Sequence, residues 1–306
     1  MDPRTADVQV VEVSARDGLQ NDPAELSTAQ KVELVRRTTA AGLRRQEVAS
    51  FVSPTRVPRM ADAEAVVAAL ADDADRDAAA YIGLVLNVRG FERAAATRLD
   101  EVNLVVAASD AFTERNQGMT TDAAVATVEQ VAPLARAAGL VPTVTVSTSF
   151  GCPFSGEVPV DHLVALCERL AASGVEELAL ADTIGVAVPR DVVERVRRVR
   201  AATGDVRLRA HFHNTRNTGY ANALAAFEEG VAVLDASLGG IGGCPFAPRA
   251  TGNIATEDLV YLLERSGVRT GLDLDALIAA GEWLGEELGR PTPSLVAKAG
   301  GFPTGE

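Results

Sequence analysis

Two of the three histidines of the chain lie two positions apart, at His211 and His213, within the segment VRLRAHFHNTRNTG. Alternate side chains of a β-strand point to the same face, so a strand here would direct both imidazoles to one side. Two neutral imidazoles that converge on one point can bind a divalent metal ion. The alternative is a surface strand with two unremarkable histidines, and the pair alone does not decide between the two.

Two further candidate ligands follow other apolar runs. Asp17 comes after the first run of the chain, and Asn253 comes after the eighth. Together with the histidines they offer two nitrogen and two oxygen ligands, which suits an octahedral Mg²⁺ or Mn²⁺ ion with positions left for water or substrate. A structural zinc site would more often recruit cysteines, and the chain has no C-x-x-C motif. Each residue also has an alternative interpretation. Asp17 could be an N-cap or turn residue before Gly18, and Asn253 could be a turn residue after Gly252.

Three residues could act on a substrate beside such a metal. Arg16 places a permanent cation next to Asp17, where it could stabilise a developing enolate oxygen; the alternative is a salt bridge at the rim. Glu47 lies on an interior strand face, where a carboxylate is costly unless paired, so we expect it to bond Arg16, to be catalytic, or both. Cys244 lies in a glycine-rich loop that offers mobility and exposed amides, although a cysteine can also simply be a small apolar residue.

The elements that must position these residues repeat regularly. Eight strand–helix units over about 265 residues favour a (β/α)8 barrel, an α/β fold whose catalytic residues lie at the carboxyl ends of the strands. A doubly wound sheet is the alternative, but no G-x-G-x-x-G follows the first strand. We expect residues 1–270 to form the barrel and 271–306 to form a short helical appendage. Strands are predicted over 8–15, 44–50, 80–87, 101–109, 141–149, 176–183, 206–213 and 231–240, and helices over 27–41, 61–71, 90–98, 121–138, 160–173, 189–202, 218–229, 256–266 and 273–288.

In this barrel, strands 1, 7 and 8 are neighbours, which would bring the four candidate ligands together. Polar residues at other strand ends are further candidates. For substrate binding we select Gln20, Ser50, Asn87 and Arg89, and for catalysis we add Asp182.

Composition excludes some classes of partner. The formal net charge of −13 argues against non-specific binding to nucleic acid or to an anionic membrane surface. Three widely spaced cysteines show no disulfide framework, which makes a reducing cytosol the default. Neither a signal-peptide pattern nor an apolar run long enough to cross a bilayer is visible. We therefore expect a cytoplasmic protein with a small-molecule substrate.

Several segments of the chain resemble the hydroxymethylglutaryl-CoA lyase family, which belongs to the metal-dependent barrel lyases and Claisen-type synthases. RDGLQN and the GGCP loop are specific to this family, whereas H-x-H and D-T-x-G are shared with the synthases. The synthases usually read RDGEQ and most carry a long C-terminal extension, so the lyase branch is favoured. The matching segments are RDGLQND (16–22), ASFVSPTRVPRM (49–60), NVRGFE (87–92), GCPF (151–154), DTIGV (182–186), HFHNT (211–215), GGIGGCPFA (239–247) and GNIATEDLVYLLE (252–264).

The resemblance implies a divalent-metal-dependent acyl-CoA lyase that cleaves 3-hydroxy-3-methylglutaryl-CoA, or a similar thioester, to acetyl-CoA and a 3-oxo acid. Arg16 would hold the thioester oxygen and Cys244 would act as an acid, with Glu47 and Asp182 assisting proton transfer. A homodimer is expected. A carboligase or aldolase of the same superfamily is the alternative, and a barrel without catalysis is a third. The implied ligands of Mg²⁺ or Mn²⁺ are Asp17, His211, His213 and Asn253.

The chain departs from the family at several positions near the barrel mouth. The family usually has Tyr at Thr145, Phe154 and Phe246, and Ser at Ala179. Gly is usual at Ala181 and Asp at Asn214. Because hydroxyls are lost while the metal ligands are retained, we expect the reaction type to be kept and the acyl group to differ, with less polarity to satisfy.

Overall fold

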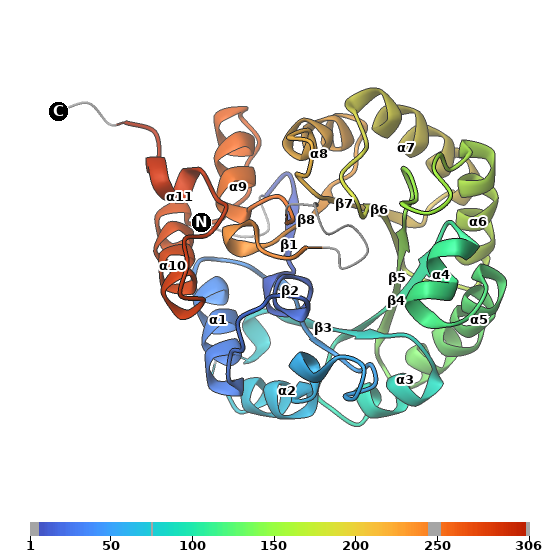
Figure 1. The fold of residues 1–306 in the computed structure, drawn as a ribbon, viewed down its shortest axis with the longest axis horizontal. Coiled ribbons are helices and arrows are strands. Elements are labelled where there is room, and N and C mark those ends of the chain that lie inside the picture. The colour runs from blue at the N-terminus through green and yellow to red at the C-terminus, as the bar shows by residue number, and fades with distance from the viewer. Residues whose placement is uncertain (1–5, 75, 244–251, 304–306) are drawn as a thin grey trace.

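The computed structural model describes residues 6–74, 76–243 and 252–303. Eight parallel strands close a barrel in sequence order, with β1 paired to β8, which confirms the expected (β/α)8 architecture. Figure 1 looks along the barrel and shows helices as an outer ring around the strands. The strands are β1 (Gln9–Glu12), β2 (Arg45–Ser50), β3 (Ala80–Val85), β4 (Glu101–Ala107), β5 (Val141–Ser147), β6 (Glu177–Asp182), β7 (Arg207–Phe212) and β8 (Val233–Ala236).

The described helices include all those expected and two more, α4 and α11. The first of these, α4, ends at Gly118, whose φ of 75° stops the helix. Its polar sequence DAFTERNQ lacks a clear apolar stripe, so apolar periodicity does not predict a helix there. The helices are α1 (Thr28–Ala40), α2 (Ala63–Ala71), α3 (Val88–Ala95), α4 (Asp110–Gln117), α5 (Thr121–Ala137), α6 (Val160–Ala172), α7 (Pro189–Thr203), α8 (Gly219–Glu228), α9 (Thr256–Arg265), α10 (Leu274–Glu287) and α11 (Val296–Ala299).

The first and eighth strands fall furthest short of their expected ranges, because the buried carboxylate of Glu12 binds the backbone that follows both. The first strand was expected over 8–15 but stops at Glu12, and Ser14–Gly18 form a π-helical turn. The eighth was expected over 231–240 but is followed by a 3₁₀ turn at Leu238–Gly240. Glu12 Oε1 accepts the backbone N–H groups of Ser14 and Leu238 at 2.8 and 2.9 Å, which satisfies donors that a strand would have paired. The π-helical turn is the element that carries Arg16 and Asp17.

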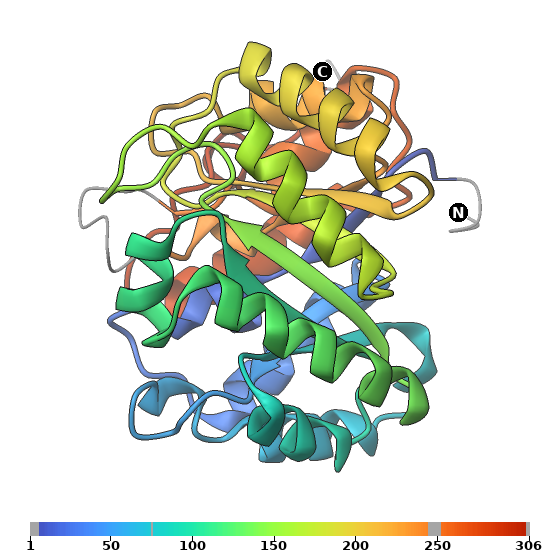
Figure 2. The same ribbon diagram turned by 90° about the vertical axis from the view of Figure 1, so that its right-hand side faces the viewer.

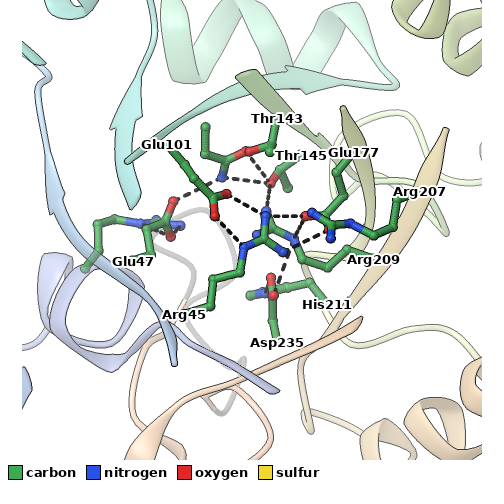
Figure 3. Close-up of polar contacts among 12 residues, drawn as sticks. Arg45, Glu47, Glu101, Thr143, Thr145, Glu177, Arg207, Arg209, His211 and Asp235 are labelled. Atoms are coloured by element: carbon green, nitrogen blue, oxygen red, sulfur yellow. Dashed lines mark hydrogen bonds and ion pairs between the residues drawn. The ribbon is translucent and has the colours of Figure 1, made fainter. Parts of the chain in front are cut away.

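The apolar core lies mainly between the sheet and the surrounding helices, and Figure 2 shows helices packed over the strands on one side of the barrel. Inside the barrel, the apolar cluster among the described residues is small and consists of Val11, Val13, Ile82 and Val233. Barrel interiors are usually filled by branched apolar side chains. Here much of the interior is charged or polar, as Figure 3 shows.

The charged part of the interior centres on Arg45. Its guanidinium binds both carboxylate oxygens of Glu101, at 2.8 and 2.6 Å, and both oxygens of Glu177, each at 2.9 Å. Arg207 adds a second cation to this group, with its Nε 2.7 Å from Glu177 Oε2. All the carboxylate oxygens of the pair are thus bound by guanidinium groups, which compensates for their burial.

Removal of the central cation should therefore destabilise the protein. We expect Arg45→Met to lower the free energy of unfolding by about 3–5 kcal/mol, because it leaves buried carboxylates without their main partner. Urea denaturation of the purified variant measures this effect. As a matched control, Arg36→Met removes an exposed pair with Asp73 and should cost less than about 1 kcal/mol. Equal losses in the two variants would contradict this interpretation.

The C-terminal segment packs on the outside of the barrel. Helix α10 lies against α1 and α9, and the Arg37 guanidinium of α1 lies 4.6 Å from the centre of the Trp283 ring. Arg290 forms an ion pair with the buried carboxylate of Asp22. No helix within the described ranges is long and apolar enough to span a membrane.

Candidate active site

Three of the four predicted metal ligands converge at the carboxyl end of the barrel. Ligand atoms of Asp17, His211 and His213 all lie within 4.8 Å of one another. His211 lies on β7, His213 follows it, and Asp17 comes from the π-helical turn after β1. Both histidines are buried. The neighbourhood of strands 1, 7 and 8 is thus confirmed.

The fourth predicted ligand, Asn253, completes the group. It forms an isolated β-bridge with His213, and its Nδ2 donates to Asp17 Oδ2 at 2.7 Å and to the Ile241 carbonyl at 3.1 Å. Its Oδ1 is buried and has no hydrogen-bond partner in the described structure. A buried amide oxygen without a donor fits a cation, because it would otherwise be costly. The residues present therefore fit a divalent ion with oxygen and nitrogen ligands.

A glycine allows this close approach. Gly242 has a φ of 106°, and a Cβ at this position would lie 2.7 Å from Asn253 Nδ2 and 2.9 Å from the Cα of Gly18. Both the backbone angle and the lack of space require glycine. The glycine-rich loop can thus pass between Asn253 and the π-helical turn.

The charges around the cluster keep Asp17 ionised and link His211 to a second carboxylate. Burial alone would raise the pKa of Asp17, but the Arg16 guanidinium and the two imidazoles lower it to about 2. Burial alone would lower the pKa of His211, but its hydrogen bond to Asp235 and the charges of Asp235 and Asp17 raise it. His211 Nδ1 lies 3.1 Å from Asp235 Oδ2. Asp235 thus fixes the ring orientation that leaves Nε2 for a ligand.

Arg16 is held between two carboxylates. Its Nε donates to Glu47 Oε2 at 2.6 Å, and its Nη1 donates to Asp17 Oδ1 at 2.8 Å. The expected bond between Glu47 and Arg16 is therefore present. The guanidinium side chain remains 11% exposed at the barrel mouth, so the cation borders the space beside the metal ligands.

The other predicted residues have different surroundings. The Oε1 of Gln20 and the Oγ of Ser50 are both buried and have no hydrogen-bond partner in the described structure. Asn87 instead caps helix α3, since its Oδ1 accepts from Gly90 N at 2.8 Å. Asn87 and Arg89 are both exposed on that helix start.

Asp182 has a structural contact that was not predicted. Its two carboxylate oxygens accept the backbone N–H groups of Val186 and Ala187, each at 2.9 Å, and shape the turn after β6. Burial nevertheless raises the pKa of Asp182 above its usual range. The predicted catalytic Cys244 lies outside the described residues, as does Phe246.

The positions that depart from the family are not simply apolar. The Thr145 hydroxyl is contacted by Arg209 Nη2 at 3.3 Å and Asn103 Nδ2 at 3.0 Å. Ala179 is paired in register with both Thr145 and Arg209, so its methyl group lies between them. Phe154 is partly exposed and lies under the guanidinium of Arg115. The guanidinium of Arg209 therefore lies beside Thr145 and Ala179, where the sequence predicts a loss of polar groups.

Sequence reasoning missed the polar residues below the cluster. Each of them is a polar residue within an otherwise largely apolar strand segment. Such a polar position could have identified them from the sequence. They are Asn103 in EVNLVV, Arg209 in VRLRAH and Asp235 in VAVLDA.

Known proteins similar to this chain include acyl-CoA lyases. A family model described as HMGL-like matches residues 7–284. The (R)-citramalyl-CoA lyase of Chloroflexus aurantiacus is 47% identical over 300 residues, which cover 96% of this chain and 95% of that protein. A hydroxymethylglutaryl-CoA lyase of Bacillus subtilis is 37% identical over 293 residues, which cover 95% and 97%. A solved HMG-CoA lyase of Acinetobacter baumannii, in complex with coenzyme A and 3-methylmalate, is 39% identical with a TM-score of 0.92, covering 98% of this chain and 97% of that chain.

Proposed function

The chain belongs to the HMGL-like family of carbon–carbon lyases, and we propose on this premise that it cleaves a 3-hydroxy-3-methyl acyl-CoA thioester with the help of a divalent metal ion. The observation that carries the proposal is the group of Asp17, His211 and His213, with the partnerless Oδ1 of Asn253 beside it. Expectations of a homodimer and of a cytoplasmic location stay predictions.

The metal ligands would be the four residues of this group. When bound, Mg²⁺ or Mn²⁺ would supply Lewis acidity that makes the tertiary alcohol of the substrate easier to deprotonate. Asp17 brings a negative charge that burial does not neutralise, since its pKa is about 2. Asp235 holds the ring of His211 in the ligating orientation.

Arg16 would stabilise the charge that develops on the substrate. Cleavage breaks the bond between C2 and C3 of the acyl group, turns the C3 alcohol into a carbonyl, and leaves the electron pair as a thioester enolate. A fixed guanidinium beside the thioester oxygen stabilises this enolate more than the neutral substrate. Glu47 keeps the guanidinium in place from 2.6 Å.

Two proton transfers complete the reaction. The alcohol must lose a proton, for which we propose the assistance of Glu47 and Asp182. The enolate carbon must gain one to become acetyl-CoA, for which we propose Cys244 as the acid. Gln20 and Ser50 are proposed to bind the substrate through their free oxygens.

For the acyl group, we propose a citramalyl thioester ahead of hydroxymethylglutaryl-CoA. The relative named as a citramalyl-CoA lyase shares 47% of residues, against 37% for the Bacillus subtilis hydroxymethylglutaryl-CoA lyase. 3-Methylmalate, found in the Acinetobacter baumannii enzyme, has as many carbons as citramalate. The citramalyl group is one methylene shorter than hydroxymethylglutaryl, so cleavage yields a 2-oxo acid. The sequence predicts an acyl group that is less polar. Because Arg209 keeps the barrel interior polar, we propose instead an acyl group that is shorter.

Assays with a panel of thioesters test this proposal. We expect acetyl-CoA release from citramalyl-CoA with kcat/KM of about 10⁴ M⁻¹s⁻¹ or above, at least tenfold over hydroxymethylglutaryl-CoA. Analysis of the second product separates a 2-oxo acid from a 3-oxo acid. A preference for hydroxymethylglutaryl-CoA would contradict the proposed citramalyl substrate but would leave the proposed lyase activity standing. Condensation without cleavage of either thioester would favour the carboligase alternative.

A further inference from the structure

Three polar side chains inside the barrel, Asn103, Thr145 and Arg209, form a connected group that we call the polar floor. They come from β4, β5 and β7, so only the closed barrel brings them together. Asn103 and Arg209 are each no more than 2% exposed. Burial of these groups is costly unless they bond to one another or to charged neighbours.

One end of the polar floor holds Glu47. Asn103 Nδ2 donates to Glu47 Oε1 at 3.0 Å, while Arg16 takes the other oxygen, Oε2, at 2.6 Å. Each carboxylate oxygen therefore has its own donor. The amide fixes the plane of the carboxylate, and the carboxylate in turn fixes the guanidinium.

The other end holds Asp235 through an ion pair with Arg209. Arg209 Nε lies 3.4 Å from Asp235 Oδ1, and His211 Nδ1 lies 3.1 Å from Oδ2. The carboxylate is again shared between a residue of the floor and a residue of the site. Figure 3 shows Asp235 between Arg209 and His211.

Thr145 joins the two ends. Its Oγ1 lies 3.0 Å from Asn103 Nδ2, 3.2 Å from Asn103 Oδ1 and 3.3 Å from Arg209 Nη2. Between Thr145 and Arg209, the paired position on β6 is Ala179, which is small enough for the guanidinium to pass. The polar contacts therefore run continuously from Arg16 through the floor to His211.

We propose that Asn103, Thr145 and Arg209 are positioning residues for the lyase reaction, which hold Arg16 through Glu47 and His211 through Asp235. This inference rests on the proposed function. The polar floor thus contacts both carboxylates, Glu47 through the amide of Asn103 and Asp235 through the guanidinium of Arg209. The part of the floor next to Glu47 controls the rate of the chemical step, and the part next to Asp235 controls affinity for the metal.

Two substitutions, the first of them isosteric, test the two ends. Thr145→Val keeps the shape but removes the oxygen, so kcat should fall about tenfold or more while KM and the Kd for Mn²⁺ stay within twofold. Thr145→Ser restores the oxygen and should recover most of the kcat. Arg209→Met removes the partner of Asp235 and should raise the Kd for Mn²⁺ by about 10–100-fold. Thr127→Val, on the outer helix α5, controls for the loss of a threonine hydroxyl.

The readouts are steady-state kinetics, Mn²⁺ binding by electron paramagnetic resonance, and thermal unfolding. A kcat for Thr145→Val within twofold of wild type, or a change in KM alone, would overturn the proposal. So would an unchanged Mn²⁺ affinity in folded Arg209→Met. If Arg209→Met does not fold, Arg209→Gln tests the same contact with Asp235, with the same expected rise in the Kd for Mn²⁺. Failure of the proposed function is separately visible, because the wild-type protein would then cleave no thioester while still showing its Mn²⁺ affinity.

Discussion

Replacement of Asp17 by alanine is expected to abolish turnover and to remove measurable binding of Mn²⁺. Asp17 contributes the carboxylate to a group of ligand atoms within 4.8 Å of one another, and its pKa of about 2 keeps it charged at any working pH. Substitution of a residue behind a ligand typically costs 10–100-fold in metal affinity, and loss of a ligand itself should cost more. The paired readouts are kcat with excess Mn²⁺ and the Kd for Mn²⁺.

The controls separate the loss of a ligand from a loss of fold. Asp17 lies on a turn at the barrel mouth with a side chain 20% exposed, so the thermal midpoint should change little. Asp73→Ala removes a carboxylate that pairs with Arg36 at the surface, and it should leave both readouts unchanged. His213→Ala should reproduce the effect of Asp17→Ala. Full activity of the wild-type protein in excess chelator would show that the metal proposal is wrong.

The sequence was sufficient for the barrel and for the cluster because both depend on local patterns. Strand periodicity gave eight units, and the i, i+2 spacing of His211 and His213 placed both rings on one face. In the closed barrel, β8 pairs with both β1 and β7, so these three strands lie side by side. Asp17 and Asn253 could therefore be assigned without knowledge of any distance.

The polar interior could not be predicted in the same way. An isolated carboxylate or guanidinium within a barrel is very costly, so Arg45, Glu101 and Glu177 make sense only as a set. Their positions along the chain are far apart, and their proximity follows from the barrel register. The early end of the first strand has a similar origin, because Glu12 accepts a hydrogen bond from the backbone N–H of Leu238, which follows the neighbouring strand β8 but is far away in the sequence. The local periodicity of apolar residues does not predict either of these contacts.

Replacement of Arg16 by glutamine should separate binding from chemistry. We expect kcat to fall by about two to four orders of magnitude with little change in KM, because the guanidinium interacts more strongly with the enolate than with the ground-state thioester. Arg16 is well placed for this role, since Glu47 and Asp17 hold it in one orientation beside the metal ligands. Steady-state kinetics with the preferred thioester measures the effect.

The lysine variant tests the importance of that orientation. Arg16→Lys keeps the charge but cannot bond Glu47 and Asp17 with the same planar geometry, so its kcat should lie between those of wild type and Arg16→Gln. Arg93→Gln, which removes a guanidinium paired with Glu64 on α2, serves as a control for the loss of an arginine. If Arg16→Gln raised KM and left kcat unchanged, Arg16 would bind ground state and transition state equally. The enolate would then need another source of stabilisation, and the guanidinium held by Glu47 would serve only to place the thioester.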